Sequence, residues 1–553
     1  MLYPKIPLAQ SIIEICLAKG IEHVVISPGS RNAPLTIGFA NIPAFTCYSI
    51  ADERCAGFFA LGIAQQIKKP VVLVCTSGSA VLNYFPAVAE AYYSQIPLVV
   101  ISADRPKEKI DIGDGQTIQQ EAVFGTHSLY NANLTEEASE ENDIEINEAF
   151  NKAFTKKGPT HINVPFEEPL YETVSKPEVD TIITTFSKIY KTIPLPDIIA
   201  ATNIWNTSRK KLVLVGTNEP GSIEKELLNK LAKDPSVVIM TECTSNLHHP
   251  AIVQHIDRII TPFTPEDFEA LSPDVLLTFG GMIVSKRIKA FLRNYPPFNH
   301  WHIDRHRAYD TFNALTHHFE AHPNEFFNQF LPYTKKIESD YQEQFTIIKE
   351  ARKVKHENYV SRLPFSDFKA FDMLLKKIPH HCMLQIGNSA PIRYAQLIEL
   401  HSSIEVFCNR GTSGIDGSTT TAVGAAVGAQ KDTVMVTGDV SFLYDSNALW
   451  NQYIPENFKI IVMNNGGGGI FRILPGHQDN SVFTTFFETS HCLTAEHLAK
   501  MYHFDYQSAH DEVSLKKILP EFFKNTQKPK ILEIFTPTAQ NDVVLKQYFS
   551  SLV

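Results

Sequence analysis

The sequence predicts an α/β protein built from three doubly wound domains, each with its own parallel β-sheet. The chain has 553 residues, which is too long for one hydrophobic core and fits about three domains. Short apolar runs alternate with stretches of helical periodicity, a pattern typical of parallel sheets covered by helices on both faces. Loops rich in glycine, serine and asparagine follow several of the apolar runs.

The first predicted domain covers residues 1–180. Its apolar runs "HVVISPGS", "FTCYSI", "PVVLVCTSG", "IPLVVISADRP" and "PTHINVPF" are typical of buried strands. After the second run, Ala56, Phe59, Ile63 and Ile67 fall on one face of a predicted helix. Ligands of parallel sheets bind at the carboxyl ends of the strands, which is where "SPGSRN", "ADER", "TSGSA" and "ADRP" lie.

Two further domains follow a polar, proline-containing stretch near residues 175–198. The central domain, predicted over residues 195–345, has the runs "KLVLVGT", "VVIMTE", "VLLTFGG" and "HWHIDR". The third domain, predicted over residues 355–553, has "HCMLQIGNS", "IEVFCNRG", "DTVMVTGD", "KIIVMNN" and "KILEIFTP". Each set predicts another parallel sheet.

Composition and charge exclude several classes of function. The net charge is −10, which argues against nucleic-acid binding and against binding to an anionic membrane surface. No run of about 18 apolar residues predicts a membrane span, and the N-terminal stretch resembles a helix more than a signal peptide. The eight cysteines show no CxxC spacing, as expected of reduced thiols. These features together predict a cytoplasmic protein.

The most specific motif is "GDVSFLYDSNALWNQYIPENFKIIVMNNGGGGIF", in which two apolar strands end in polar residues. Asp439 and Asn465 would each offer a side-chain oxygen, and Gly467 a backbone carbonyl, which are ligands that Mg²⁺ prefers. The glycines would let the backbone approach a diphosphate closely. Either half of the motif alone is also typical of a simple turn; the two together, 26 positions apart, are more specific.

This motif resembles the cofactor-binding motif of the thiamin diphosphate-dependent decarboxylase and carboligase superfamily. The resemblance implies that Asp439, Asn465 and the Gly467 carbonyl hold Mg²⁺, with Mn²⁺ as an alternative, against the cofactor's diphosphate. Gly438 belongs to the same cofactor site. Val440 departs from the pattern, because many members have a third glycine there. The implied domain order is pyrimidine-binding, central and diphosphate-binding.

Two more residues match cofactor contacts of this superfamily. Glu53, in "YSIADERCAGFF", stands where members have a catalytic glutamate that hydrogen-bonds the aminopyrimidine ring. The alternative is an acidic residue placed at a helix start by the helix dipole. Ile415, in "SGIDG", resembles the bulky residue that supports the cofactor in its bent shape.

Seven motifs in register resemble the 2-succinyl-5-enolpyruvyl-6-hydroxy-3-cyclohexene-1-carboxylate synthase family of the menaquinone pathway. They are "VISPGSRNAPLT", "DERCAGFFALGIA", "TSGSAVLNYFPAVAEA", "ISADRP", "NRGTSGIDG", "GDVSFLYDSNAL" and "NNGGGGIFRILP". The resemblance implies a transferase that decarboxylates 2-oxoglutarate and adds the succinyl unit to isochorismate. Both substrates are dicarboxylates, so the site requires several cationic groups.

The resemblance assigns substrate contacts to Ser30, Arg31, Gln116, Lys286, Arg287, Arg393, Arg410, Ile470, Phe471 and Leu474. Gly115 departs from the family pattern, which usually has Asn before the glutamine, and this puts one polar contact in doubt. Simpler alternatives stay open for part of the set. Ser30 would cap a helix, the Lys286–Arg287 pair would be solvated, and the three apolar residues would belong to the core.

In this superfamily the cofactor lies between subunits, so Glu53 of one chain would face the diphosphate motif of another. The resemblance therefore implies a homodimer or a homotetramer. Two other functions stay open. One is a different thiamin diphosphate-dependent 2-oxo acid decarboxylase or synthase, and the other is a non-enzymatic protein with the same fold.

Overall fold

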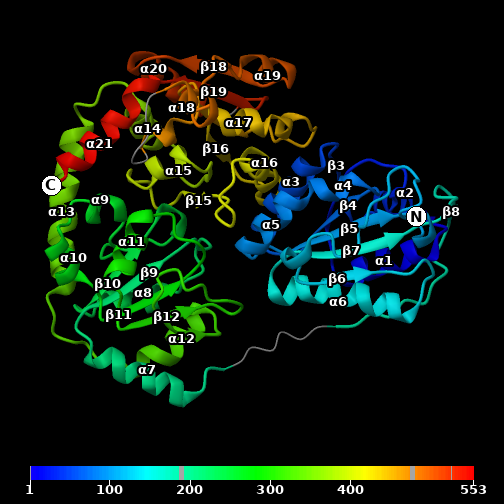
Figure 1. Cartoon of the computed structure of the whole chain (residues 1–553), viewed down its shortest axis with the longest axis horizontal. Coiled ribbons are helices and arrows are strands. Elements are labelled where there is room, and N and C mark those ends of the chain that lie inside the picture. Colours follow the sequence, from blue (N-terminus) through cyan, green and yellow to red (C-terminus); the bar gives the residue numbers. More distant parts are fainter. Residues whose placement is uncertain (1, 186–191, 474–479, 525) are drawn as a thin grey trace.

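The computed structural model describes residues 2–185, 192–473, 480–524 and 526–553, and contains three parallel β-sheets (Figure 1). The N-terminal, central and C-terminal units each hold one of these sheets, with helices on both faces (Figure 1). The prediction of three doubly wound α/β units is confirmed. The domain limits expected from the sequence stay predictions.

The N-terminal unit has a six-stranded sheet of order β3-β2-β4-β5-β7-β6, in which all neighbours are parallel. Its strands are β2 (His23–Ile26), β3 (Thr46–Ser49), β4 (Val71–Cys75), β5 (Leu98–Asp104), β6 (Asn131–Asn133) and β7 (Thr160–Pro165). Its helices are α1 (Pro7–Ala18), α2 (Ala33–Asn41), α3 (Glu53–Ile67), α4 (Ser79–Asn83), α5 (Phe85–Ser94) and α6 (Glu140–Lys156). A short antiparallel pair, β1 (Tyr3–Pro4) with β8 (Thr173–Val174), joins the beginning of this unit to its end.

The central unit has a five-stranded parallel sheet of order β10-β9-β11-β12-β13. Its strands are β9 (Lys211–Val215), β10 (Val237–Thr241), β11 (Val275–Phe279), β12 (Asn299–Ile303) and β13 (Leu315–Phe319). Its helices are α7 (Leu195–Thr207), α8 (Lys225–Ala232), α9 (Ile256–Ile260), α10 (Pro265–Leu271), α11 (Lys286–Asn294) and α12 (Pro323–Phe330). The long helix α13 (Tyr341–Val360) leads from this unit to the next.

The C-terminal unit repeats the topology of the first, with the order β15-β14-β16-β17-β19-β18. Its strands are β14 (Met383–Ile386), β15 (Glu405–Phe407), β16 (Thr433–Gly438), β17 (Lys459–Asn464), β18 (Asp505–Ala509) and β19 (Lys530–Phe535). Its helices are α14 (Asp367–Leu375), α15 (Ala390–Ala395), α16 (Ser418–Ala429), α17 (Asp439–Tyr444), α18 (Ser481–Phe486), α19 (Glu496–Met501), α20 (Glu512–Phe522) and α21 (Asn541–Ser551).

Burial explains why these runs form the sheets. All five residues of β4 and of β9 are buried, as expected of strands covered on both faces. Along α3, Ala56, Phe59 and Ile63 are fully buried, so the predicted apolar face exists. In the part of the chain that the structure describes, no helix is long and apolar enough to cross a membrane.

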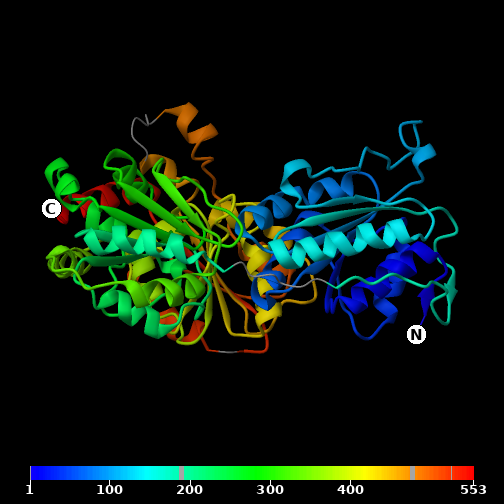
Figure 2. The same cartoon turned by 90° about the horizontal axis from the view of Figure 1, so that it is seen from below.

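The N-terminal and C-terminal units meet where α3 lies along α16, near the middle of the molecule (Figure 2). The two backbones approach so closely that glycine is required on both sides. A Cβ atom at Gly62 would lie 2.2 Å from the Thr421 carbonyl oxygen, and one at Gly424 would lie 2.0 Å from the Phe59 carbonyl oxygen. The contact therefore tolerates no side chain at these two positions.

We expect Gly62→Val to lower the free energy of unfolding by about 1–3 kcal/mol or more, because the added atoms meet backbone that has little freedom to move. Thermal unfolding followed by circular dichroism measures the change. Gly115→Ala is the matched control, since a Cβ there meets nothing within 4 Å. Equal stability of the two variants would contradict the close helix contact.

Candidate active site

The predicted cofactor motif, with Asp439 and residues 464–467, lies at the carboxyl ends of β16 and β17, which are neighbours in the C-terminal sheet. We call this group of residues the diphosphate corner. Asp439 begins α17 and is only 4% exposed. Its carboxylate accepts hydrogen bonds from the backbone amides of Val440 at 2.7 Å, Gly466 at 2.9 Å and Gly467 at 3.0 Å. The two halves of the motif therefore meet at one carboxylate, although 26 positions separate them.

Asn465 presents an oxygen that has no partner of its own. Its Nδ2 donates to Asp367 Oδ2 at 2.9 Å, which fixes the orientation of the amide. Its Oδ1 is buried and accepts no hydrogen bond in the described part of the chain. Buried polar oxygens are rarely left unsatisfied, and an amide oxygen beside a carboxylate suits a hard divalent cation. These residues thus fit Mg²⁺ and a diphosphate.

The glycine run gives this corner its shape. Gly466 has φ +78° and Gly467 has φ +150°, backbone conformations that side chains other than hydrogen disfavour. A Cβ at Gly467 would also lie 2.6 Å from the Glu488 carbonyl oxygen. The chain therefore needs glycine here to turn its amides toward Asp439.

Burial raises the pKa of Asp439 to about 6, while the Val440 amide, His491 and the Gly467 amide lower it again. His491 Nε2 lies 3.5 Å from Asp439 Oδ2. A bound divalent cation would add the positive charge that holds this carboxylate ionised. Within the described ranges, no group of three His, Cys, Asp or Glu residues is placed to hold a metal ion.

Glu53 is the first residue of α3 and is half-buried. Asn83 Nδ2 donates to its Oε2 at 3.5 Å. The flanking residues contact the C-terminal unit: Asp52 accepts from Asn447 Nδ2 at 2.7 Å, and Arg54 donates to the Tyr444 carbonyl at 3.1 Å. Among the described residues of this one chain, no hydrogen bond or ion pair joins Glu53 to the diphosphate corner.

The other N-terminal candidates lie around the ends of β2 and β4. Arg31 is 4% exposed and donates to the Phe166 carbonyl at 2.9 Å, with Glu168 3.3 Å away. Ser30 is exposed; the residue at the N-cap of α2 is Asn32. Gln116 is exposed in a loop with φ +58°. These residues stay separate from the diphosphate corner within one chain.

A cationic group lies at the carboxyl end of β14. Arg393 sits on α15 and Arg410 follows β15. Arg410 Nη1 donates to Asn388 Oδ1 at 2.7 Å, while its Nε is buried without a partner in the described chain. Burial lowers the pKa of Arg393, Asp257 raises it, and the neighbouring Arg410 lowers it further. Two guanidinium groups in one place suit a carboxylate-bearing ligand.

The central unit faces this group from the start of α11. Lys286 and Arg287 begin that helix and are exposed. The Arg287 guanidinium lies 4.6 Å from the centre of the Phe549 ring. Behind them, the buried Glu242 accepts from the amides of Val284 and Ser285, both at 2.7 Å. Burial raises the pKa of Glu242 to about 7, against the effect of these two amides.

The apolar candidates divide between the corner and its surroundings. The Ile415 carbonyl accepts from Ser441 Oγ at 3.0 Å, which places this residue beside α17. Ile470 and Phe471 are half-buried in the 3₁₀ turn Gly469–Ile473. Leu474 lies outside the described residues.

Sequence reasoning missed several buried polar residues that hold the candidates in place. They are Glu90, Glu242, Asp367 and Asn388, all at most 4% exposed. Glu90 of α5 accepts from the amides of Gly411 at 2.7 Å and Thr412 at 2.6 Å, so the N-terminal unit clamps the loop that follows Arg410. A lone acidic residue in the apolar helix sequence "FPAVAEAYYS" was the available signal.

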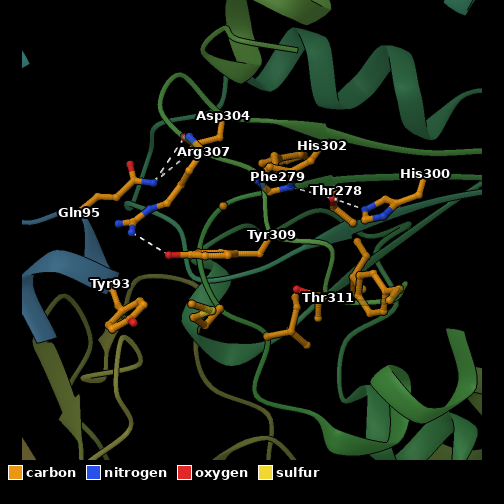
Figure 3. Close-up of a pocket in the computed structure, with 16 residues that line it drawn as sticks. Tyr93, Gln95, Thr278, Phe279, His300, His302, Asp304, Arg307, Tyr309 and Thr311 are labelled. Carbon is orange, nitrogen blue, oxygen red and sulfur yellow. Dashed lines mark hydrogen bonds between the residues drawn. The ribbon is translucent and has the colours of Figure 1, made fainter. Parts of the chain in front are cut away.

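A small cavity lies between α5 and the central sheet (Figure 3). Asp304, Arg307 and Tyr309 line it, and Gln95 reaches in from the N-terminal unit (Figure 3). Gln95 Nε2 lies 3.3 Å from Asp304 Oδ2, and Arg307 donates to the Tyr309 hydroxyl at 2.8 Å. The cavity holds about 50 Å³, which is room for very few waters and too little for a dicarboxylate.

Comparisons with known proteins show which proteins this chain is similar to. The N-terminal TPP-binding domain of thiamine pyrophosphate enzymes matches residues 6–146, and their C-terminal TPP-binding domain matches residues 388–534. A relative from Flavobacterium psychrophilum named 2-succinyl-5-enolpyruvyl-6-hydroxy-3-cyclohexene-1-carboxylate synthase is 64% identical over 100% of both chains. Relatives of the same name from Flavobacterium johnsoniae and Christiangramia forsetii are 63% and 53% identical over 100% of this chain, and cover 100% and 99% of their own lengths.

We expect Asp439→Asn to weaken Mg²⁺-dependent binding of thiamin diphosphate by about tenfold or more, because a charged ligand to the cation is lost. Isothermal titration with the cofactor, with and without Mg²⁺, measures the change. Asp505→Asn, an exposed position on β18 of the same unit, is the control. Unchanged affinity in Asp439→Asn would remove this carboxylate from the site.

Proposed function

Because this chain belongs to the 2-succinyl-5-enolpyruvyl-6-hydroxy-3-cyclohexene-1-carboxylate synthase family of thiamine pyrophosphate enzymes, we propose that it decarboxylates 2-oxoglutarate and adds the succinyl unit to isochorismate. The observation that carries the cofactor site is the unpaired, buried oxygen of Asn465 beside the Asp439 carboxylate. Thiamin diphosphate, when bound, supplies the electron sink for decarboxylation and the nucleophilic carbon for the new bond.

In this proposal the chain's own residues bind, orient and move protons. Asp439, Asn465 and the Gly467 carbonyl would hold Mg²⁺, for which Mn²⁺ would be an alternative, with the cofactor's diphosphate, and Gly438 would let the backbone come close. Ile415 would support the cofactor. Glu53 would hold or release a proton at its carboxyl group, which would hydrogen-bond the aminopyrimidine ring.

The two arginines near the carboxyl end of β14, Arg393 and Arg410, support the proposal that the substrates are dicarboxylates. Burial is the main cause of the lowered pKa of Arg393, and the neighbouring Arg410 lowers it further; a substrate carboxylate between the two arginines would relieve their repulsion. The remaining proposed substrate contacts are Ser30, Arg31, Gln116, Lys286, Arg287, Ile470, Phe471 and Leu474. The first three come from the N-terminal unit and the next two from the central unit, so all three units would contribute to the substrate site.

The test of this function is CO₂ release by the purified protein with thiamin diphosphate, Mg²⁺ and 2-oxoglutarate, with and without isochorismate. Release that depends strongly on isochorismate, with formation of the adduct, supports the synthase. Equal release without isochorismate would instead indicate a simple 2-oxo acid decarboxylase. No release in either case would overturn the choice of donor.

We expect Glu53→Gln to lower kcat by about 10²–10³, because a preorganised proton-transfer group is lost. Cofactor affinity should change little, since the diphosphate corner is intact. Steady-state kinetics and cofactor titration measure the two quantities, with Glu22→Gln, an exposed acidic residue of the same unit, as the control. Near-normal turnover in Glu53→Gln would contradict its catalytic role.

The same variant tests whether the site is shared between two copies of the chain, as the proposed homodimer or homotetramer requires. Coexpressed Glu53→Gln and Asp439→Asn chains would form mixed pairs in which one site carries both changes and the other carries neither. Activity well above that of either variant alone supports a shared site. Mixed pairs as inactive as each parent would place both residues of a site in one chain.

We expect Arg410→Ala to raise KM for a dicarboxylate substrate by about tenfold or more, because a charge-assisted hydrogen-bond donor is removed. Cofactor affinity should stay unchanged. Initial-rate kinetics against each substrate measures the effect, and Arg362→Ala, an exposed position, is the control. An unaltered KM for both substrates would remove Arg410 from the substrate site.

A further inference from the structure

A cavity of about 510 Å³ lies where the central unit, α13 and the C-terminal unit meet. Residues 248–258 line one side, Lys349 and Lys353 of α13 a second, and residues 399–402 a third. The segment 248–258 runs into helix α9, which lies beside α13 (Figure 1). The volume is in the range of sites that hold a small metabolite.

Arg258 on α9 is the unusual residue of this cavity. It is only 5% exposed, and its Nε is buried without an acceptor in the described chain. None of the hydrogen bonds or ion pairs formed among the described residues involves its guanidinium. Burying an arginine without a hydrogen-bonded counter-charge costs free energy. Burial lowers the pKa of Arg258, and Tyr548, Glu399, Glu357 and Glu350 raise it from beyond ion-pair distance. The cavity thus holds a buried cation that lacks a partner.

The other charges around the cavity are mixed, with positive groups in excess. Lys349 donates to the Pro250 carbonyl at 3.1 Å, and Lys353 is half-buried. Glu350 and Glu399 also line the cavity, but both are exposed and neither lies within ion-pair distance of Arg258. A positive cavity on a chain of net charge −10 favours an anionic ligand.

Histidine contributes fixed polar groups to the same cavity. His255 is 8% exposed, and its Nδ1 lies 2.9 Å from the Gln396 carbonyl oxygen. That ring nitrogen therefore carries the proton and donates to Gln396. Burial and the nearby Arg258 hold the pKa of His255 well below its usual value, so the ring stays neutral. Arg258 and the two lysines thus supply the positive charge.

We propose that this cavity binds a small metabolite through a carboxylate or phosphate group, with the Arg258 guanidinium as its anchor. A guanidinium offers paired donors that match the two oxygens of either group. Lys349 and Lys353 add positive charge at the rim. The bound anion would accept the hydrogen bonds for which the described chain offers the Arg258 guanidinium no acceptor.

This cavity is separate from the candidate active site, although one short helix touches both. Asp257, the residue before Arg258, accepts from Ser285 Oγ and lies near Arg287 and Arg393. Gln396, which accepts from His255, directly follows the helix that carries Arg393. An anion bound at Arg258 would therefore contact the elements that position the cationic side chains proposed to bind the substrates. The proposal itself does not rest on the proposed function.

The test uses the full-length protein saturated with thiamin diphosphate and Mg²⁺. Sodium phosphate and sodium succinate are titrated against sodium chloride at equal ionic strength, and Tm and Kd are measured. For the wild type we expect a saturable rise in Tm beyond the chloride control. The tighter of the two anions identifies whether phosphate or carboxylate is the preferred group.

Arg258→Met keeps an unbranched apolar stem and removes the guanidinium group with its charge. We expect this variant to have a higher Tm than the wild type in chloride, because an unpaired buried charge is gone. Its anion affinity should fall by about tenfold or more. Arg258→Lys, which keeps the charge but loses the paired donors, should bind more weakly than the wild type and more tightly than Arg258→Met. Arg362→Met, an exposed arginine, should behave as the wild type.

Three results would overturn the site. A lower Tm or failure to fold in Arg258→Met would mean that the guanidinium is structural. An anion response that persists unchanged in this variant would belong to another site, such as the diphosphate corner. A wild type that responds to phosphate and succinate no more than to chloride would have no such site.

Discussion

The architecture depends on the close contact between α3 and α16, which joins the two outer units. Gly62 on α3 and Gly424 on α16 carry no side chain, so at these two positions carbonyl and amide groups of the two backbones meet directly. The ends of the helices are fixed by Asp445, which is fully buried and accepts from the Thr420 amide and hydroxyl, both at 2.7 Å, with Arg54 3.7 Å away. Burial raises the pKa of Asp445 to about 7. Because the two helices have little room to shift relative to each other, their contact fixes the relative positions of the loops at the edges of the two sheets.

Buried carboxylates then transmit this fixed geometry to the candidate site. Glu90 clamps the loop after Arg410, Glu242 holds the start of α11, and Asp367 orients the amide of Asn465. Each carboxylate loses water on burial and regains hydrogen bonds from amides or hydroxyls. Such residues act through others, because they hold the loops and helix ends that carry the candidate residues.

The strands and the motif residues that follow them could be predicted from local sequence patterns. Hydrogen bonds between residues far apart in the chain could not. Asp439 and Asn465 could be found because both follow apolar runs, and β16 and β17 became neighbours in the sheet. Glu90 pairs with amides 321 and 322 positions away, so no spacing in the chain connects them. The Arg258 cavity likewise combines segments of two units and the helix between them.

The choice of an amide at position 465 has an electrostatic reason. A cation held against a diphosphate already has several negative oxygens around it, and each further carboxylate would repel the others. Asp367 lies directly behind Asn465, and burial raises its pKa, so a second carboxylate in the corner would be costly in the empty site. The amide offers an oxygen without charge, and its Nδ2 satisfies Asp367 at the same time. One neutral side chain thus separates two carboxylates and leaves Asp439 as the charged ligand of the proposed cation.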